Sequence, residues 1–302
     1  MTEPRPLDVV TPDVTLRALT WGPDDGPIAL CLHGFPDTAL GWRRVAPVLA
    51  DAGWRVIAPF MRGYAPSSVS SHGSYHVGAL MDDALRVLDA AGPTGRDVII
   101  GHDWGGAAAA GIAALPDSPF SSAVVMSLPP VPAFMPSRGV GFSRSLAALL
   151  PAQMVRSWYI TYFQLPWLPE RSRSWVLPLL WRRWSPGYHA EEDLRHVHAA
   201  IGSPANWKAA LGYYRAALSV AKPPDRYADF QRLWTNGKVV HPTLYLHGAD
   251  DGCMTVKLAD RVPAVLPDGS DVAVIDGAGH FIQLEQPEAV AAHILGFVGS
   301  PR

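Results

Sequence analysis

The sequence predicts an α/β protein whose central sheet is mostly parallel and carries helices on both faces. Short apolar runs alternate with segments of helical periodicity from residue 1 to residue 128, and this alternation favours a parallel sheet covered by helices. The alternation breaks at Leu128-Pro129-Pro130 and resumes near residue 239. We therefore predict a core of residues 1–128 and 239–302, with a helical cap of residues 129–238 inserted after the sixth strand.

Buried strands are expected where apolar residues form short runs, and helices where apolar residues recur every three or four positions. Leu80, Ala84 and Val87, for example, share one face of an expected helix, and Pro287 marks the start of another. The expected strands cover residues 14–18, 28–33, 56–59, 98–101, 123–127, 243–247 and 272–275. The expected core helices cover residues 75–91, 105–115, 258–265 and 287–297.

Composition and charge exclude several classes of protein. The net charge is −2 and no long Lys/Arg run occurs, which disfavours a nucleic-acid partner. No apolar run is long enough to span a membrane. Cys31 and Cys253 are too few for a disulfide framework, so we expect free buried thiols in a cytoplasmic protein. We expect no cofactor and no metal, because no dinucleotide fingerprint occurs and His196 and His198 would not share a helix face.

The strongest chemical signal is the segment Gly101-His102-Asp103-Trp104-Gly105, which follows an expected strand and opens an expected helix. This G-x-D-x-G arrangement is typical of a nucleophile elbow, with aspartate in the position that usually holds serine. The glycines permit a tight turn that lifts residue 103 above the sheet edge. The helix that follows would present N–H groups and a positive dipole to an anion.

Three further positions complete a candidate catalytic group. In His33-Gly34-Phe35-Pro36 the N–H of Phe35 can form an oxyanion hole together with the N–H of Trp104. Asp251 follows the expected strand at 243–247, and His280 follows the one at 272–275. The order nucleophile, acid, histidine is that of the α/β-hydrolase triad. Taken singly, Asp251 is typical of a turn residue and His280 of a loop histidine. The prediction therefore depends on the order of Asp103, Asp251 and His280 along the chain.

These segments together resemble the epoxide hydrolase and haloalkane dehalogenase group of α/β-hydrolase fold enzymes, over nearly the whole chain. In this group the acid lies three residues after a glycine, which selects Asp251 over Asp250. One departure is Ala65, where the group usually has glycine. The matching segments are HGFP at 33–36, RGY at 62–64, SS at 67–68, GHDWGG at 101–106, GADD at 248–251 and GH at 279–280.

An aspartate nucleophile carries information about the substrate. A carboxylate that attacks a saturated carbon forms an ester, and water activated by a His–Asp pair can hydrolyse that ester. Backbone N–H donors would then stabilise the tetrahedral oxyanion, each worth about 3–4 kcal/mol. Asp103 therefore predicts an electrophilic alkyl carbon in an epoxide or an alkyl halide, and argues against an ordinary esterase.

The choice between these two classes depends on the leaving group, because an epoxide oxygen needs a proton and a halide does not. The resemblance implies two cap tyrosines as proton donors: Tyr162 resembles the first motif and Tyr214 the second, with Tyr159 and Tyr213 as rivals. Phe35 lacks the side-chain halide donor of some haloalkane dehalogenases, and fluoroacetate dehalogenases have arginine where this chain has Trp104.

We therefore predict an epoxide hydrolase that adds water to a small apolar epoxide to give a vicinal diol. A haloalkane or haloacid dehalogenase, and a non-catalytic small-molecule receptor on the same scaffold, are the alternatives. The oligomeric state stays open, with a homodimer as one option. Seven of the 11 tryptophans lie between residues 129 and 238, which predicts an apolar, water-poor pocket beneath the cap. Its expected lining residues are Phe35, Pro36, Trp104, Tyr213 and Phe281.

Overall fold

The computed structural model describes residues 3–135, 144–219 and 222–301, and is built on one eight-stranded sheet of order β1-β2-β4-β3-β5-β6-β7-β8. β2 runs antiparallel to both of its neighbours, and the strands from β4 to β8 are parallel. The predicted α/β class is therefore confirmed. The strands are β1 (Arg5–Val10), β2 (Thr15–Trp21), β3 (Ile28–Leu32), β4 (Arg55–Pro59), β5 (Val98–His102), β6 (Ser122–Met126), β7 (Thr243–Gly248) and β8 (Asp271–Ile275).

Seven of these strands coincide with predicted ones, and the two differences have physical causes. β1 was not predicted because it is an edge strand whose side chains are mostly exposed, so no apolar run marks it. The helix predicted over 258–265 is instead a pair of 3₁₀ helices, η2 (Val256–Arg261) and η3 (Pro263–Val265). Pro263 has no N–H to donate to a continuing helix and so interrupts it.

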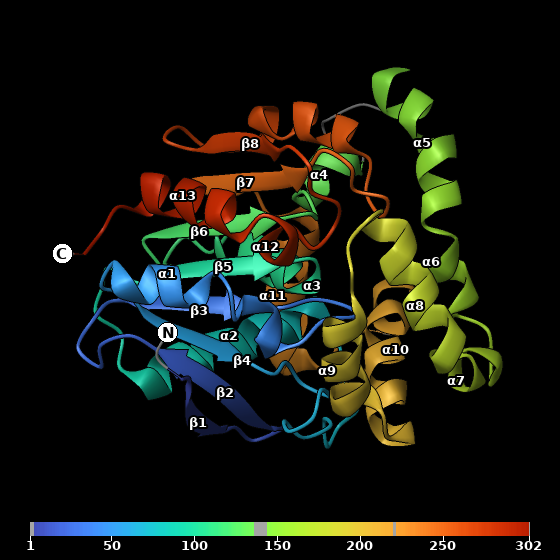
Figure 1. The fold of residues 1–302 in the computed structure, drawn as a ribbon, viewed down its shortest axis with the longest axis horizontal. Helices are drawn as coiled ribbons and strands as arrows, with labels where there is room; N and C mark the ends of the chain where they lie inside the picture. Colours follow the sequence, from blue (N-terminus) through green and yellow to red (C-terminus); the bar gives the residue numbers. More distant parts are fainter. Residues whose placement is uncertain (1–2, 136–143, 220–221, 302) are drawn as a thin grey trace.

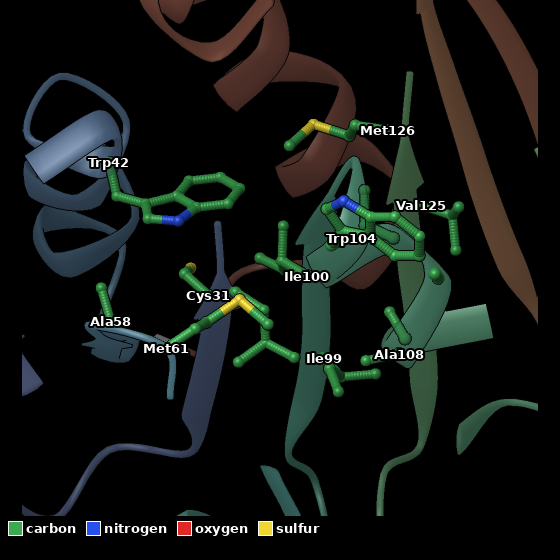
Figure 2. Packing of buried hydrophobic residues seen from close by; sticks show 14 of the residues in the cluster. Cys31, Trp42, Ala58, Met61, Ile99, Ile100, Trp104, Ala108, Val125 and Met126 are labelled. Carbon is green, nitrogen blue, oxygen red and sulfur yellow. The ribbon is translucent and has the colours of Figure 1, made fainter. Parts of the chain in front are cut away.

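Helices cover both faces of the sheet (Figure 1). α1 (Ala46–Asp51) and α13 (Pro287–Val298) pack together on one face, and α2 (Val77–Ala91), α3 (Trp104–Ile112) and α11 (Asp225–Asn236) pack on the other. Ile99 and Ile100 of β5 are fully buried in the centre of this core (Figure 2). The core therefore places β5 and the turn that follows it in the middle of the sheet, shielded on both sides.

The remaining helices gather mainly beyond the carboxyl ends of the parallel strands (Figure 1). They are α4 (Val131–Phe134), α5 (Arg144–Arg156), α6 (Trp158–Tyr162), α7 (Leu168–Arg171), α8 (Arg173–Trp184), α9 (Glu191–Ile201) and α10 (Pro204–Leu218); two short helices, η1 (Ala39–Trp42) and α12 (Ile282–Glu285), belong to core segments. α11, predicted as part of the cap, packs on α2 and α3 instead. We propose that the cap is better bounded at residues 144–219.

Three cap helices are tied to the core by hydrogen bonds. From α8, the indole N–H of Trp181 donates to the carbonyl of Pro36 over 3.1 Å. From α9, Asp193 accepts a hydrogen bond from Arg43 over 2.7 Å. From α10, the hydroxyl of Tyr213 donates to the carbonyl of Arg62 over 2.8 Å. These contacts fix the cap over the strand ends. Across the described ranges, no helix combines the length and apolarity needed to cross a membrane.

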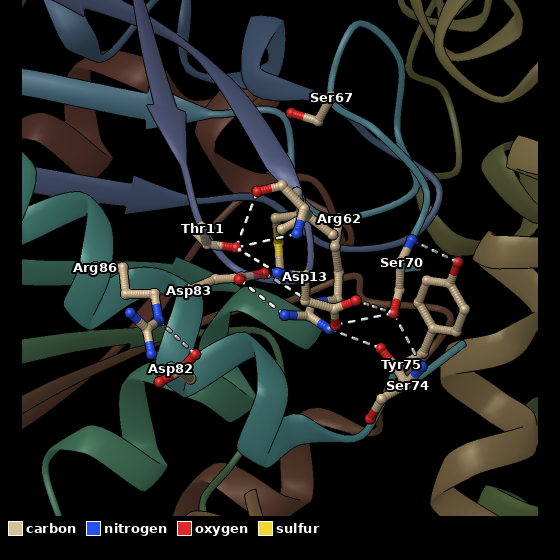
Figure 3. A network of polar contacts seen from close by, with 12 residues as sticks. Thr11, Asp13, Arg62, Ser67, Ser70, Ser74, Tyr75, Asp82, Asp83 and Arg86 are labelled. Carbon is tan, nitrogen blue, oxygen red and sulfur yellow. Dashed lines mark hydrogen bonds and ion pairs between the residues drawn. The ribbon is translucent and has the colours of Figure 1, made fainter. Parts of the chain in front are cut away.

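A buried ionic network fixes the loop after β4 (Figure 3). Arg62 is fully buried, and its guanidinium donates two hydrogen bonds to Asp83, at 2.7 and 2.8 Å, and one to Asp13 at 2.9 Å. Ser67 and Ser68 bind the backbone of β2 through their hydroxyls. The Arg-Gly-Tyr and Ser-Ser segments are therefore structural in this chain, and hold the surface on which α10 rests.

Replacing Arg62 with alanine should strongly destabilise the protein, because it leaves the buried carboxylates of Asp83 and Asp13 without their countercharge. Loss of one partner of a buried ion pair costs about 3–5 kcal/mol. The matched control is Arg86→Ala, which removes the largely exposed pair with Asp82 and should cost about 1 kcal/mol or less. Urea unfolding of both variants measures the difference, and equal losses would show that the Arg62 network does not hold the fold.

Candidate active site

The elbow between β5 and α3 forms as predicted and places Asp103 at the centre of the sheet edge. Asp103 has φ 51° and ψ −115°, a region that L-residues seldom occupy. A Cβ on Gly101 would lie 2.1 Å from the carbonyl oxygen of Gly105, and one on Gly105 would lie 2.3 Å from that of Leu32. Only glycine fits at these two positions, so the backbone packing itself holds the strained residue in place.

The carboxylate of Asp103 lies among backbone donors. The N–H of Phe35 donates to Oδ1 over 2.7 Å, as expected for one half of an oxyanion hole. Burial raises the pKa of Asp103, while His280 and the N–H groups of Phe35 and Trp104 oppose this rise. Because Oδ1 is occupied by this donor, Oδ2 is the oxygen left available to attack a substrate.

His280 and Asp251 form the predicted acid–histidine pair. Nδ1 of His280 lies 3.0 Å from Oδ2 of Asp251, and Nε2 faces Oδ2 of Asp103 at 3.9 Å. Burial lowers the pKa of His280, but the negative charges of Asp251 and Asp103 outweigh it and raise the pKa above its usual value. Among the described residues Nε2 has no hydrogen-bond partner, so it is free to accept a proton.

The loop after β7 selects Asp251 over its neighbour Asp250. Oδ1 of Asp251 accepts the N–H groups of Cys253 and Met254, at 2.6 and 2.9 Å, which leaves Oδ2 for His280. Burial raises the pKa of Asp251, but His280 and these donors overcome it and lower the pKa below its usual value. Asp251 therefore stays ionised and orients the histidine, while Asp250 is exposed.

Two residues that sequence reasoning did not assign to the site hold the His280 backbone. His102 and Ser127 each lie 2.8 Å from its carbonyl oxygen, through Nε2 and Oγ respectively. Burial lowers the pKa of His102 well below its usual value, so the imidazole is neutral. Ser127 also has a positive φ of 61° at the end of β6. Only the tertiary structure brings these strand ends to His280.

The predicted cap residue Tyr214 packs on the residues that flank Asp103. Its ring contacts Phe35 at 5.1 Å and Trp104 at 5.2 Å, and its hydroxyl has no hydrogen bond of full geometry among the described residues. Burial and the charge of Asp103 raise the pKa of Tyr214 well above 10, partly opposed by the indole N–H of Trp104. The hydroxyl is therefore protonated and available as a donor.

The other predicted tyrosine, Tyr162, is not brought to this group. Its ring contacts Trp158 and Trp175, and its hydroxyl donates to the carbonyl of Leu168 at 3.5 Å. The rival Tyr159, three residues earlier, lies on the inner face of α6. This places the ring of Tyr159 against that of Tyr214 at 5.5 Å. We propose that the motif match is offset by one helical turn and belongs to Tyr159, which the spacing alone could not reveal.

Tyr159 is fully enclosed in the aromatic centre of the site. Its hydroxyl lies 3.4 Å from the sulfur of Cys253. Burial, together with Cys253, Tyr214 and Asp103, raises the pKa of Tyr159 well above 10. It is therefore, like Tyr214, a neutral hydroxyl close to the carboxylate.

The remaining predicted lining residues lie at different distances from the chemistry. Phe281 packs on His280 at 5.2 Å and stacks on Trp181 at 3.6 Å. Pro36 binds Trp181 through its carbonyl. The ring of Tyr213 lies 6.0 Å from that of Trp104, but its hydroxyl donates a hydrogen bond to the backbone carbonyl of Arg62. Trp184, which was not predicted, contacts both His280 and Tyr159.

Asp251, Cys253 and His280 bring three potential metal-ligand atoms within 4.8 Å of one another. The carboxylate of Asp251 already binds His280 and two backbone N–H groups, and the sulfur of Cys253 lies beside the Tyr159 hydroxyl. The grouping is therefore accounted for by the triad and its packing, and the expectation of no metal stays a prediction.

Changing Asp251 to asparagine should lower the pKa of His280 below its ordinary value of about 6.5, because burial remains while the main opposing charge is lost. Changing the exposed neighbour Asp250 to asparagine is the matched control and should leave that pKa in place. NMR titration of the histidine ring signals, with His280→Gln to assign the resonance, measures both. An unchanged pKa in Asp251→Asn would contradict the assigned pairing.

Comparison with known proteins agrees with this geometry. The profile of the alpha/beta hydrolase fold family matches residues 27–287. The AB hydrolase superfamily protein YfhM of Bacillus subtilis is 30% identical, and the alignment covers 96% of each chain. Epoxide hydrolase A of Mycobacterium tuberculosis is 29% identical, again over 96% of both chains.

Solved structures extend the likeness to the fold. Epoxide Hydrolase A from Mycobacterium thermoresistibile superposes with a TM-score of 0.71 at 25% identity, over 97% of this chain and 98% of that one. A structure from Klebsiella pneumoniae superposes with a TM-score of 0.81 at 24% identity over 97% of both chains, which shows the shared fold. With an elbow, an acid and a histidine on the expected strand ends, this chain belongs to the α/β hydrolase fold family.

Proposed function

We propose that this protein is an epoxide hydrolase that acts through a covalent ester on Asp103. The observation that carries the proposal is the pairing of two neutral cap hydroxyls, Tyr159 and Tyr214, beside a buried aspartate at an elbow. Relatives named epoxide hydrolases, matched over nearly the whole chain, support the same substrate class. The substrate would be a small apolar epoxide with water as co-substrate, in a cytoplasmic enzyme that needs no cofactor.

In the first step Oδ2 of Asp103 attacks a ring carbon of the epoxide. The C–O bond of the ring breaks as the new ester bond forms, and the departing oxygen takes a proton from a tyrosine hydroxyl. An alkoxide is a stronger base than a phenolate, so this transfer is favourable even from Tyr159 and Tyr214, whose pKa values are raised. The apolar surroundings strengthen each of these polar contacts.

In the second step Nε2 of His280 takes a proton from water, and the hydroxide formed adds to the ester carbonyl of Asp103. The N–H groups of Phe35 and Trp104 stabilise the resulting oxyanion. The tetrahedral intermediate then collapses. The leaving oxygen takes the proton held by His280 and departs as the diol, and the carboxylic acid formed on Asp103 gives its proton to the tyrosinate, which restores the carboxylate and the tyrosine hydroxyl. Since the pKa of His280 is raised, the histidine loses its basic form as the pH falls through that pKa. The hydrolytic step should therefore slow as the pH falls through the pKa that His280 has in the ester intermediate.

Esterification of Asp103 also changes the electrostatics of its partner. The ester carries no charge, so one of the carboxylates that raise the pKa of His280 is neutralised after the first step. Asp251 and Glu285 then oppose the effect of burial without Asp103. The pKa of His280 should therefore fall in the intermediate, which favours the neutral imidazole at the moment when it must act as a base.

Dehalogenation is the alternative that uses the same nucleophile. The buried indole N–H of Trp104 has no hydrogen bond of full geometry among the described residues and could hold a halide. Two tyrosine hydroxyls beside Asp103, however, have no task when the leaving group is already a stable anion. A receptor without turnover would in turn have no use for the Asp251–His280 pair, which is directed at Asp103.

Replacing His280 with glutamine should trap the ester, because opening of the ring needs Asp103 while its hydrolysis needs the histidine. Incubation with an aryl or alkyl epoxide should raise the intact mass of the protein by the mass of one epoxide. The double variant with Asp103→Asn is the control and should gain no mass. Adducts formed with haloalkanes but with no epoxide would establish the dehalogenase, and binding without any adduct would establish the receptor.

Replacing Tyr159 or Tyr214 with phenylalanine should lower the rate of ring opening, by roughly 10²–10⁴-fold for loss of a general acid, with the larger effect in the double variant. Tyr162→Phe is the matched control on the same helix and should leave the rate close to wild type. Single-turnover kinetics in the His280→Gln background isolate this step. A loss in Tyr162→Phe with none in Tyr159→Phe would restore the original motif assignment.

A further inference from the structure

The outer end of the cap exposes aromatic side chains that a folded protein normally buries. Trp167 is 62% exposed and Trp175 is 50% exposed, and Leu165 and Leu168 beside them are partly exposed. Trp167 has a positive φ of 51°, which is costly for a bulky residue. The chain here therefore strains its backbone to hold a large apolar ring outward, a combination that marks functional surfaces.

These side chains form one continuous patch across α6, α7 and α8. The ring of Tyr162 contacts that of Trp175 at 5.8 Å, and its hydroxyl reaches the carbonyl of Leu168. The guanidinium of Arg171 lies 5.4 Å from the centre of the Trp167 ring. We define the Trp/Arg patch as Tyr162, Trp167, Arg171, Trp175, Arg182 and Arg183.

The charge of this part of the chain is strongly one-sided. Residues 144–184 contain six arginines, no lysine and one acidic residue, Glu170, which gives a net charge of +5. The whole chain carries −2, so the remainder carries −7. Glu170 pairs with Arg215 of α10. Within the described ranges no ion pair is found for Arg171, Arg182 or Arg183, all of which are exposed.

We propose that the Trp/Arg patch docks the cap on an anionic lipid surface. Exposed tryptophan and tyrosine beside unpaired arginines is the composition that lies at a membrane interface, where the rings enter the headgroup region and the cations meet lipid phosphates. A second copy of this chain is the less favourable occupant, because a two-fold contact through the patch would bring its arginines against those of the partner.

A groove beside the patch ends at the aromatic ring that covers His280. It has a volume of about 370 Å³ and is lined in part by Trp158, Arg183 and Trp184. Arg183 lies over the ring of Trp158, next to the patch, while Trp184 contacts His280 at 5.0 Å. Apolar molecules dissolved in a membrane would thus meet the protein on the side where one aromatic ring separates the groove from the site. The docking itself does not depend on the proposed reaction.

The test is flotation of the full chain with vesicles of phosphatidylcholine and phosphatidylglycerol in equal parts, against vesicles of phosphatidylcholine alone. The wild type should float with the anionic vesicles and lose this binding at high salt. Each arginine near an anionic surface contributes about fivefold to binding. The triple variant Arg171→Gln, Arg182→Gln, Arg183→Gln should therefore lower the partition coefficient on the order of 100-fold. Trp167→Ser with Trp175→Ser should also release the protein.

Matched controls come from the core. Arg5→Gln, Arg96→Gln and Arg232→Gln change the net charge equally, and Val10→Ser with Val274→Ser removes exposed apolar groups, without touching the patch. These controls should float as the wild type does. Thermal unfolding of every variant checks that it is folded. No flotation of the wild type, equal loss in the controls, or a dimer in sedimentation that the tryptophan changes abolish would each overturn the proposal.

Discussion

The close packing of backbone at the turn after β5 is the constraint on which the rest of the site depends. Gly101 and Gly105 let that turn approach the α3 backbone and the end of β3 more closely than any side chain would allow. The packing holds Asp103 in an unfavourable conformation and leaves its carboxylate against the N–H of Phe35. Phe35, Asp251 and His280 are positioned relative to this fixed carboxylate, since β3, β7 and β8 all present their ends at the same edge.

Burial then sets the electrostatics of the group. It raises the pKa values of Asp103, Tyr159 and Tyr214 together, while the negative charges around the equally buried His280, that of Asp251 foremost, allow it to bind a proton readily. The tyrosine hydroxyls thereby stay protonated, as the proposed ring opening requires, and loss of the Asp103 charge in the ester would return His280 toward its neutral form. The same apolar enclosure that prevents competing reactions with solvent also makes loss of a single partner costly.

The aromatic cap divides its side chains between two tasks. Those facing inward, such as Trp184 and Tyr159, are buried and pack together beside His280. Those facing outward, Trp167 and Trp175, stay in solvent at the far end of the same helices. The high tryptophan content of the sequence therefore has two sources, an apolar site and an exposed aromatic surface. Composition alone could not show which tryptophans belong to which.

The sequence by itself determined the α/β class, the elbow at Asp103, and the positions of Phe35, Trp104, Asp251 and His280 around it. These features follow from local turn chemistry and from the order of strand ends, which a chain records directly. Only the tertiary structure decided which cap tyrosine faces Asp103, that α11 packs on the core, and that His102 and Ser127 support His280. Such contacts depend on the rotation of a helix about its axis and on its place over the sheet, and a shift of one helical turn leaves the residue pattern almost unchanged while reversing which side chain points inward.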